Sequence, residues 1–321
     1  MIQIQILKYS RQMARRIKED VFRGILEFLY YFYAGAVLIL TARINLGKNI
    51  FEMDWDLLII LDACRVDAMI QIAPEYDFIQ NVDVATSVGS SSDEWLAKTF
   101  NKKHADKIAK TSYITANPNF SMVIDERLAP PIHAPVPFRP SLNYYGTVSM
   151  DDFAHFDEVY KDSRGRREKV VLPSTLVERA IDAGRRSVAQ KYVIHFMQPH
   201  VPYIGVPNPP SDPFQLYKND NLSHSEIWDM YLDTLRLVLD EVQKLLNNFD
   251  AERVIITADH GEAFGEWNLY SHTICSPQPV VKNVPIVTTK SKDNREYIPQ
   301  INKKSTTEWN PDEQLRDLGY L

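Results

Sequence analysis

Apolar residues along this chain occur in short continuous runs, and longer stretches with helical spacing separate those runs. Residues 56–62 (DLLIILD), 192–197 (YVIHFM) and 253–259 (RVIITAD) are nearly all apolar, which is typical of strands buried on both faces of a parallel sheet. Residues 173–190 open with Pro-Ser-Thr, a common helix start, and residues 226–249 repeat apolar positions at intervals of three and four. This alternation predicts an α/β fold, with a mixed, mostly parallel sheet and helices on both faces.

Metal-capable side chains stand where these predicted strands end. Asp62 and Asp259 close two of the strands, and His200 follows just past the third. Ligands of such sheets bind beyond the carboxyl ends of the strands. The topology therefore predicts a site at one edge of the sheet.

The strongest local pattern is TADHGEAFGE at residues 257–266, followed by NLYSH at 268–272. Asp259 and His260 can present a carboxylate and an imidazole to one divalent ion, and zinc accepts this mixture of ligands. Gly261 would let the chain turn away sharply, and His272 could return as a further ligand. The alternative is a strand-end aspartate that caps a helix beside an incidental histidine.

Two further segments flank predicted strand ends. In WDLLIILDACRVDAM, Asp62 is costly to desolvate unless a metal or a cation pairs with it, and the alternative is a structural ion pair with Arg65. In VIHFMQPHVPY, two prolines restrain the turn that would aim His200. His195 lies inside the strand, where a hydrogen-bonded core role is the more common one.

A serine-rich loop at residues 85–100 (ATSVGSSSDEWLAKTF) opens a predicted helix. A hydroxyl at a helix start meets free amides that stabilise an anionic group, and metal contact would lower its pKa and make it a nucleophile. The alternative is that Ser92 is only the N-cap, with Asp93 and Glu94 complementing the helix dipole.

Together these segments resemble the alkaline phosphatase superfamily, in particular its sulfatase-like branch. TADHGEAFGEWNLYSH resembles the Asp-His-Gly-Glu block of sulfatases and lipid phosphoethanolamine transferases. HFMQPHVPY resembles the sulfatase-like segment whose final His binds metal or substrate, and LDACRVD resembles the first metal-ligand strand of the family. Archaeal-type sulfatase-like proteins are similar over about residues 49 to 321, through NIFEMDWDLLIILDACRVD, GSSSDEWLAKTF and the ending EQLRDLGYL.

The resemblance implies a role for each matching position. Asp62, Asp259 and His260 would hold a first metal beside the nucleophile, while His200 and His272 would hold a second metal or the anionic oxygens of the substrate. TSVGSSS resembles the transferases' Thr-Ser-Cys-Gly-x-Ser-Thr segment, whose last Thr attacks. The candidate catalytic residues are therefore Ser92, with Ser90 as the runner-up, and Arg65. We expect one or two divalent ions per chain, with zinc favoured over magnesium, manganese or calcium.

One departure from sulfatases bears on the reaction. Sulfatases form formylglycine from Cys-x-Pro-x-Arg, but Cys64 is followed by Arg-Val-Asp and Cys275 by Ser-Pro-Gln. A serine nucleophile favours hydrolysis or transfer of phosphate esters. Two alternatives stay open: a sulfate-ester hydrolase without formylglycine, and a non-enzymatic binding protein that retains the fold.

Composition and net charge limit the classes of partner that this chain is expected to bind. Of 321 residues, 45% are hydrophobic and 24% are charged, which is ordinary for a globular protein, and the net charge of −6 gives no basic footprint for nucleic acid. We expect an anionic ester substrate, either glycan- or lipid-linked. Two cysteines make a disulfide framework unlikely and fit a reducing compartment.

The N-terminal segment is basic and aromatic. The apolar run 28–42 is shorter than the roughly 18 to 20 residues that span a bilayer, but its tyrosines suit a membrane interface. A peripheral membrane contact through residues 1–45 and a helix packed on the catalytic domain are both open. No cleavage site for a secretory signal is obvious, so we expect the cytoplasm or the inner face of the membrane. The basic residues before the apolar run are Lys8, Arg11, Arg15, Arg16, Lys18 and Arg23.

The chain divides into three predicted parts. Residues 1–48 form the basic, aromatic helical segment, 49–290 the sulfatase-like catalytic domain, and 291–321 a polar tail with a short final helix at 311–319. The Pro-rich stretch 129–140 (APPIHAPVPFRP) is predicted to be a surface excursion within the catalytic domain.

Overall fold

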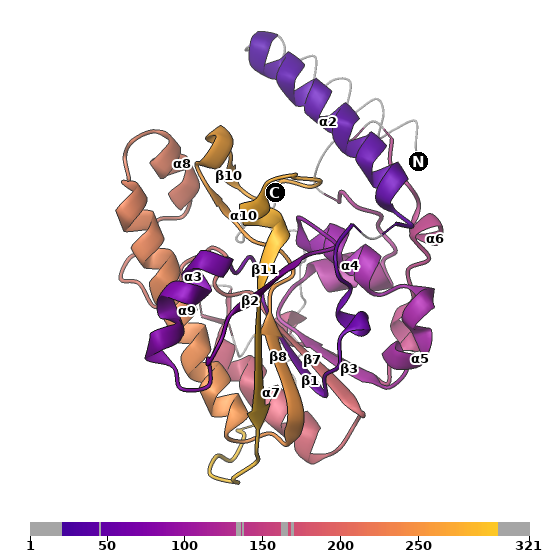
Figure 1. The fold of residues 1–321 in the computed structure, drawn as a ribbon, viewed down its shortest axis with the longest axis vertical. Helices are drawn as coiled ribbons and strands as arrows, with labels where there is room; N and C mark the ends of the chain where they lie inside the picture. Colours follow the sequence, from indigo (N-terminus) through magenta and orange to yellow (C-terminus); the bar gives the residue numbers. More distant parts are fainter. Residues whose placement is uncertain are drawn as a thin grey trace.

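A seven-stranded sheet in the order β2-β11-β8-β1-β7-β3-β4 forms the centre of the molecule (Figure 1). The computed structural model describes residues 21–44, 46–132, 136, 138–161, 166–167 and 170–300. The strands of this sheet are β1 (Leu57–Leu61), β2 (Asp83–Thr86), β3 (Thr111–Thr115), β4 (His155–Glu158), β7 (Lys191–Phe196), β8 (Ala251–Thr257) and β11 (Asn283–Ser291).

The five strands from β8 to β4 run parallel, and β11 is antiparallel to both β8 and β2. The predicted mixed, mostly parallel sheet is therefore confirmed. Two short ribbons lie outside it, β5 (Arg166–Arg167) with β6 (Val170–Val171) and β9 (Ala263–Phe264) with β10 (Tyr270–Ser271).

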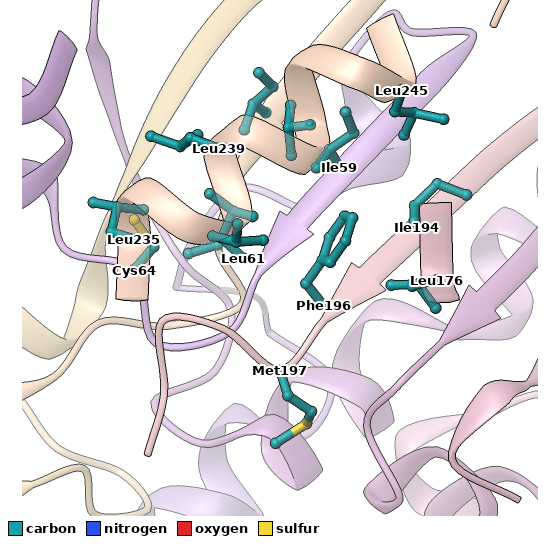
Figure 2. Packing of buried hydrophobic residues seen from close by; sticks show 14 of the residues in the cluster. Ile59, Leu61, Cys64, Leu176, Ile194, Phe196, Met197, Leu235, Leu239 and Leu245 are labelled. Atoms are coloured by element: carbon teal, nitrogen blue, oxygen red, sulfur yellow. The ribbon is translucent and has the colours of Figure 1, made fainter. Parts of the chain in front are cut away.

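Strand β1 lies at the middle of the sheet because all of its side chains are apolar and buried. Alternate residues serve opposite faces: Ile59 belongs to one hydrophobic cluster, and Leu58 and Ile60 belong to another. Figure 2 shows the Ile59 face, where Ile194 and Phe196 of β7 lie among side chains of the covering helices. The labelled helix residues there are Leu176, Leu235, Leu239 and Leu245.

Helices cover both faces, as the prediction requires. On the Ile59 face lie α3 (Val66–Ile72), α7 (Pro173–Arg185) and α9 (His224–Leu246), and on the other face lie α4 (Ser92–Thr99) and α5 (Ala105–Ile108). The remaining helices are α2 (Val21–Thr41), α6 (Leu142–Tyr145), α8 (Pro213–Lys218) and α10 (Pro279–Lys282).

The two helices read from the sequence are confirmed with shifted ends. Helix α9 begins earlier than predicted because Ser223 and Glu226 form a capping box. Helix α7 stops at Arg185, five residues before the predicted end, and Ser187 then adopts a φ of 51°, which a helix cannot contain.

Both ends of the described chain pack on the sheet domain. The ring of Phe138, in the Pro-rich stretch, lies 5.1 Å from that of Phe32 in α2. Near the other end, the amide of Tyr297 donates to Asn248 Oδ1 at 2.9 Å. The predicted helix at 311–319 lies outside the described residues. Over the described part of the chain, no helix has both the length and the apolar character that a membrane crossing requires.

Candidate active site

The site lies where the parallel strands β7, β1 and β8 end side by side. Asp62 directly follows β1, and His200 lies four residues beyond β7. Asp259 was predicted to close its strand, but β8 ends at Thr257 and Asp259 lies two residues further on. The three side chains come from loops at the same sheet edge, as the topology predicts.

The Ser92 hydroxyl is the centre of this group. It donates to Asp259 Oδ2 at 2.7 Å and lies 3.3 Å from Asp62 Oδ2 and 3.4 Å from His260 Nε2. His260 Nε2 is also 3.4 Å from Asp259 Oδ2 and 3.7 Å from Asp62 Oδ1. All four side chains are fully buried. The structure thus brings together the four residues that the resemblance placed around a first metal.

The neighbouring serines have other partners. Ser90 Oγ lies 3.0 Å from both Glu94 Oε2 and the carbonyl oxygen of Thr273, to one of which its single proton is donated, and Ser91 Oγ donates to Asp93 Oδ1 at 2.5 Å. Among the three adjacent serines, Ser92 is therefore the one whose hydroxyl reaches the two carboxylates. Ser90 instead fastens this loop to the segment after His272.

The helix start differs from the expectation by one residue. Ser92 was expected to be the N-cap of its helix, but Ser91 holds that position with an extended backbone (φ −152°, ψ 155°), and Ser92 is the first helical residue. The helical backbone of Ser92 turns its side chain to the side of Asp62 and Asp259. The hydroxyl still lies at the positive end of α4.

The loop after β1 has a strained backbone that places an amide donor against Asp259. Ala63 adopts a φ of 58°, and its amide donates to Asp259 Oδ1 at 3.2 Å. Tyr231 of α9 holds this turn through two hydrogen bonds. Its hydroxyl donates to the carbonyl of Ala63 at 2.8 Å and accepts a hydrogen bond from the amide of Arg65 at 2.9 Å. The amide of His260 adds a second donor to Asp259 Oδ1, at 2.9 Å.

One carboxylate oxygen at the centre has no protein donor. Asp62 Oδ2 accepts from Asn117 Nδ2 at 2.9 Å, whereas the buried Asp62 Oδ1 has no hydrogen-bond partner among the described residues. Leaving a buried charged oxygen unsatisfied is expensive. Two carboxylates, an imidazole and a hydroxyl around one point form a donor set that suits a divalent cation, zinc included, so the residues fit the metal that the resemblance implies.

The hydrogen bond at the far side of the His260 ring selects its tautomer. Nδ1 lies 2.9 Å from the carbonyl of Gly261, which can only accept, so Nδ1 carries the proton. Nε2, which faces Asp62 and Asp259, then has the lone pair that a metal ligand needs. Gly261 is required for a different reason from the predicted turn: a Cβ there would lie 2.1 Å from the carbonyl oxygen of Val280.

A second group of metal-capable side chains adjoins the first. Ligand atoms of His200, Glu262 and His272 all lie within 4.8 Å of one another. The ring of His272 is 4.2 Å from that of His260 and 5.2 Å from that of His200. The structure therefore brings His200 and His272 together, as the resemblance implied, and adds Glu262 to them.

His195 supports the first group from inside β7. Its Nδ1 lies 2.6 Å from the Tyr113 hydroxyl, in agreement with the core role read from the sequence. Its Nε2 is 3.8 Å from Asp259 Oδ2 and has no hydrogen-bond partner among the described residues. His195 is thus also near enough to Asp62 and Asp259 to complete a cation site with them.

Burial sets the charges of the site. Burial raises the pKa of Asp62 well above its usual range, and the adjacent Asp259 raises it further. Burial opposes ionisation of Asp259 as well, but His260 and His195 outweigh it and lower the pKa of that carboxyl. Burial also lowers the pKa of His200 and of His272 to about 4, so both imidazoles are neutral near pH 7, the form that binds metals.

The guanidinium of Arg65, a candidate catalytic residue, pairs with two acidic side chains. Its Nε and Nη2 donate to Asp67, and its Nη1 donates to Glu266 Oε1 at 2.6 Å and to the carbonyl of Glu262 at 3.0 Å. The structural ion pair with Asp62 is not formed either, since Asp67 and Glu266 take that role. Arg65 is a positioning residue that holds the loop carrying Glu262.

Two residues of the site were missed by sequence reasoning. Glu262 lies inside the TADHGE block, but the sequence pattern assigned it no role. Asn117 follows β3, which is fully buried although its sequence, TSYIT, is largely polar. A π-helical turn at Ser121–Asp125 comes shortly after it. The signal that could have found Asn117 is the run of β-branched residues ending in Asn-Pro-Asn.

Comparison with known proteins gives distant likenesses. No protein-family model matches the sequence, and no curated protein matches it. Among solved structures, the soluble domain of lipooligosaccharide phosphoethanolamine transferase A from Neisseria meningitidis is similar, with 16% identity, a TM-score of 0.49, and coverage of 75% of this chain and 77% of that one.

Two further structures are similar at the same level. The C-terminal periplasmic domain of EcEptC from Escherichia coli, in complex with Zn, has 13% identity, a TM-score of 0.44, and coverage of 78% and 77% of the two chains. A protein in the alkaline phosphatase superfamily from Vibrio parahaemolyticus has 12% identity, a TM-score of 0.38, and coverage of 81% and 69%.

Replacing Asn117 should weaken metal binding without unfolding the protein. Asn117→Ala removes the amide donor to Asp62 Oδ2 that the loop after β3 supplies, and loss of such an orienting bond costs about 10- to 100-fold in metal affinity. Competition titration with a zinc chelator measures this. Asn119→Ala is the matched control, since Asn119 is as buried but does not contact Asp62. Equal zinc affinity in the Asn117 variant and the wild type would contradict the assigned role.

Glu262→Gln should raise the free energy of unfolding of the metal-free protein and weaken the binding of zinc. Burial raises the pKa of Glu262 from 4.5 to about 7, so above pH 7 its ionisation is more costly in the folded than in the unfolded metal-free protein. The variant should therefore raise the free energy of unfolding above pH 7, by up to about 3 kcal/mol, and the gain should vanish below pH 4.5.

With zinc present, the same variant should bind the ion more weakly, because an amide oxygen carries no charge. Thermal unfolding across this pH range, with a chelator and with zinc, measures both effects. A variant that is destabilised without metal at high pH would show that Glu262 is a structural partner of the fold.

Proposed function

We propose that this chain is a metal-dependent phosphoester hydrolase or phosphotransferase whose nucleophile is Ser92. The observation that carries the proposal is the Ser92 hydroxyl, which is buried at the start of α4 and lies within 3.4 Å of Asp62, Asp259 and His260. A hydroxyl needed only for capping gains nothing from two buried carboxylates, whereas a nucleophile needs an acceptor for its proton.

The cation would be held by Asp62, Asp259 and His260, with Ser92 beside it. When bound, a divalent ion supplies positive charge that lowers the pKa of the serine hydroxyl and offsets the charge of the attacked group. The ion also gives the unsatisfied Asp62 Oδ1 a partner.

The reaction follows from the hydrogen bonds of Ser92. Its Oγ forms a bond to phosphorus, the bond from phosphorus to the ester oxygen breaks, and the hydroxyl proton passes by way of Asp259 Oδ2 to the departing oxygen. In a second step, the oxygen of water or of an acceptor alcohol bonds to phosphorus, the bond from phosphorus to Ser92 Oγ breaks, and the proton of the attacking oxygen passes by way of Asp259 Oδ2 to Ser92 Oγ. Water gives hydrolysis, and an alcohol gives transfer.

The second group favours a second cation over direct hydrogen bonds to the substrate. Nδ1 of His200 lies 2.6 Å from the carbonyl of Val201, and Nδ1 of His272 lies 3.0 Å from Glu262 Oε1. The Val201 carbonyl can only accept, so Nδ1 of His200 donates and the lone pair of that ring is on Nε2; His272 has the same tautomer once Glu262 is ionised, above about pH 7. A lone pair binds a cation and repels a phosphate oxygen. Two cations side by side would attract an anionic ester, which we expect to be glycan- or lipid-linked.

The position of the cysteines weighs against a sulfatase that uses formylglycine. Ser92 stands at the nucleophile position, while Cys64 and Cys275 are buried elsewhere, where burial raises the pKa of both thiols. A sulfate-ester hydrolase with a serine nucleophile is the second candidate. A binding protein without activity would have no use for the buried carboxylates, which cost stability.

Ser92→Ala should lower kcat about 100-fold or more, equivalent to roughly 3 kcal/mol of transition-state stabilisation, with the fold and metal content retained. Ser91→Ala is the matched control, because Ser91 contacts Asp93 and neither carboxylate of the site. Steady-state rates with p-nitrophenyl phosphate, its diester and p-nitrophenyl sulfate measure the effect and rank phosphate against sulfate. If Ser92→Ala turns over normally, the nucleophile is another group.

Asp259→Ala should abolish stoichiometric metal binding, because it removes the carboxylate nearest to both Ser92 and His260. Elemental analysis of the purified variant measures this. Asp56→Ala is the control, since Asp56 is a carboxylate at the opposite end of the same sheet, paired with Arg253. Unchanged metal content in Asp259→Ala would refute the metal site, and a metal-loaded wild type inactive on both ester classes would refute the enzyme.

A further inference from the structure

Helix α2 is apolar on two opposite faces, and one of them is exposed. On the packed face, Ala34 and Leu38 contact Ile274 and Cys275 of the domain. The opposite face carries Ile25, Leu29 and Leu40, with exposed fractions of 46%, 56% and 70%. These three positions, spaced by four and eleven residues, form one stripe along the helix, which we call the α2 stripe.

Such a stripe needs a partner. A helix that is apolar all round is normally buried in protein or in lipid. In α2 the charged residues are Arg23 and Glu27 alone, both near its start. Figure 1 shows α2 as a rod that leaves the domain at one corner and extends beyond it. The side chains of the α2 stripe are therefore presented outward and remain in water unless something binds them.

The charge of the adjoining sequence identifies the partner. Residues 1–24 carry six Lys and Arg against Glu19 and Asp20, although the whole chain has a net charge of −6. A second copy of the chain would bring the same positive segment and be repelled. An anionic lipid surface would attract it, by about 1 kcal/mol per basic residue near the surface.

We propose that the α2 stripe docks on the surface of an anionic lipid bilayer. The helix lies on the bilayer and does not cross it, since no helix in the described residues is suited to crossing. This inference stands apart from the proposed reaction, because it depends on no residue of the site.

Docking would bring the bilayer next to the site. The hydroxyls of Tyr30 and Tyr33 donate to the carbonyls of Ile274 and Cys275, just after His272. At the other end of α2, the Thr41 hydroxyl accepts from Lys98 in the helix that Ser92 starts, at 2.9 Å. Because α2 is held to these two loops, the sheet edge that carries the site would lie close to the bilayer surface on which α2 rests.

The test is sedimentation of the full-length protein with vesicles. Vesicles of phosphatidylcholine with about a quarter phosphatidylserine should carry down the protein, pure phosphatidylcholine should bind it much less, and raised salt should release it as the charges are screened. Leu29→Ser with Leu40→Ser should weaken binding about tenfold or more, because two side chains of the α2 stripe no longer enter the interface. Ile70→Ser is the control, since Ile70 is a comparably exposed apolar residue on α3.

Several outcomes would overturn the inference. These are a wild type that binds neither vesicle, a double variant that binds like the wild type, and a wild type that forms a dimer in solution which the double variant does not. The last would assign the α2 stripe to a second copy of the chain. Zinc content and esterase rates of the double variant should equal those of the wild type, so a failure here is distinguishable from a failure of the proposed reaction.

Discussion

Two fully buried carboxylates, Asp62 and Asp259, within reach of one serine hydroxyl form the constraint on which the rest of this structure depends. Removing two like charges from water costs several kcal/mol for each, and their mutual repulsion adds to that cost. The protein offsets part of it through the amides of Ala63 and His260, the side chain of Asn117, and the imidazoles of His260 and His195. Together with the Ser92 hydroxyl, which donates to Asp259 Oδ2, these contacts satisfy three of the four carboxylate oxygens, and Asp62 Oδ1 is the one without a hydrogen-bond partner among the described residues.

The architecture around the site can be understood as the means of holding that arrangement. The central strands are apolar on both faces, so they fix the register that ends β1, β7 and β8 together. Tyr231 reaches from α9 to hold the strained turn at Ala63, and Arg65 holds the loop of Glu262 through Asp67 and Glu266. These residues hold the loops that carry the side chains of the site.

The sequence predicts those parts of the site that local pattern determines. Strand β1 is wholly apolar, and β7 and β8 each contain an apolar run, so Asp62, His200 and Asp259 could be assigned to one sheet edge. Strand β3 is equally buried, but Thr111, Ser112 and Thr115 satisfy their hydroxyls inside the fold and give no apolar signal. Asn117 was missed for that reason. The role of Arg65 depends on Glu266, about two hundred residues away, and no local pattern specifies such a contact.

In the proposed metal site, protons and cations would compete for the same carboxylates. In the metal-free protein, Asp62 has a raised pKa and Asp259 a lowered one, as expected when two adjacent carboxyls share one proton. Glu262 similarly holds a proton up to about pH 7 because it is buried. A cation must displace these protons, so its affinity rises with pH until both acids are ionised. The histidines add no proton near neutrality, since His200 and His272 have pKa values of about 4. The carboxyls therefore determine the pH at which the site fills, and the imidazoles determine which cations it prefers.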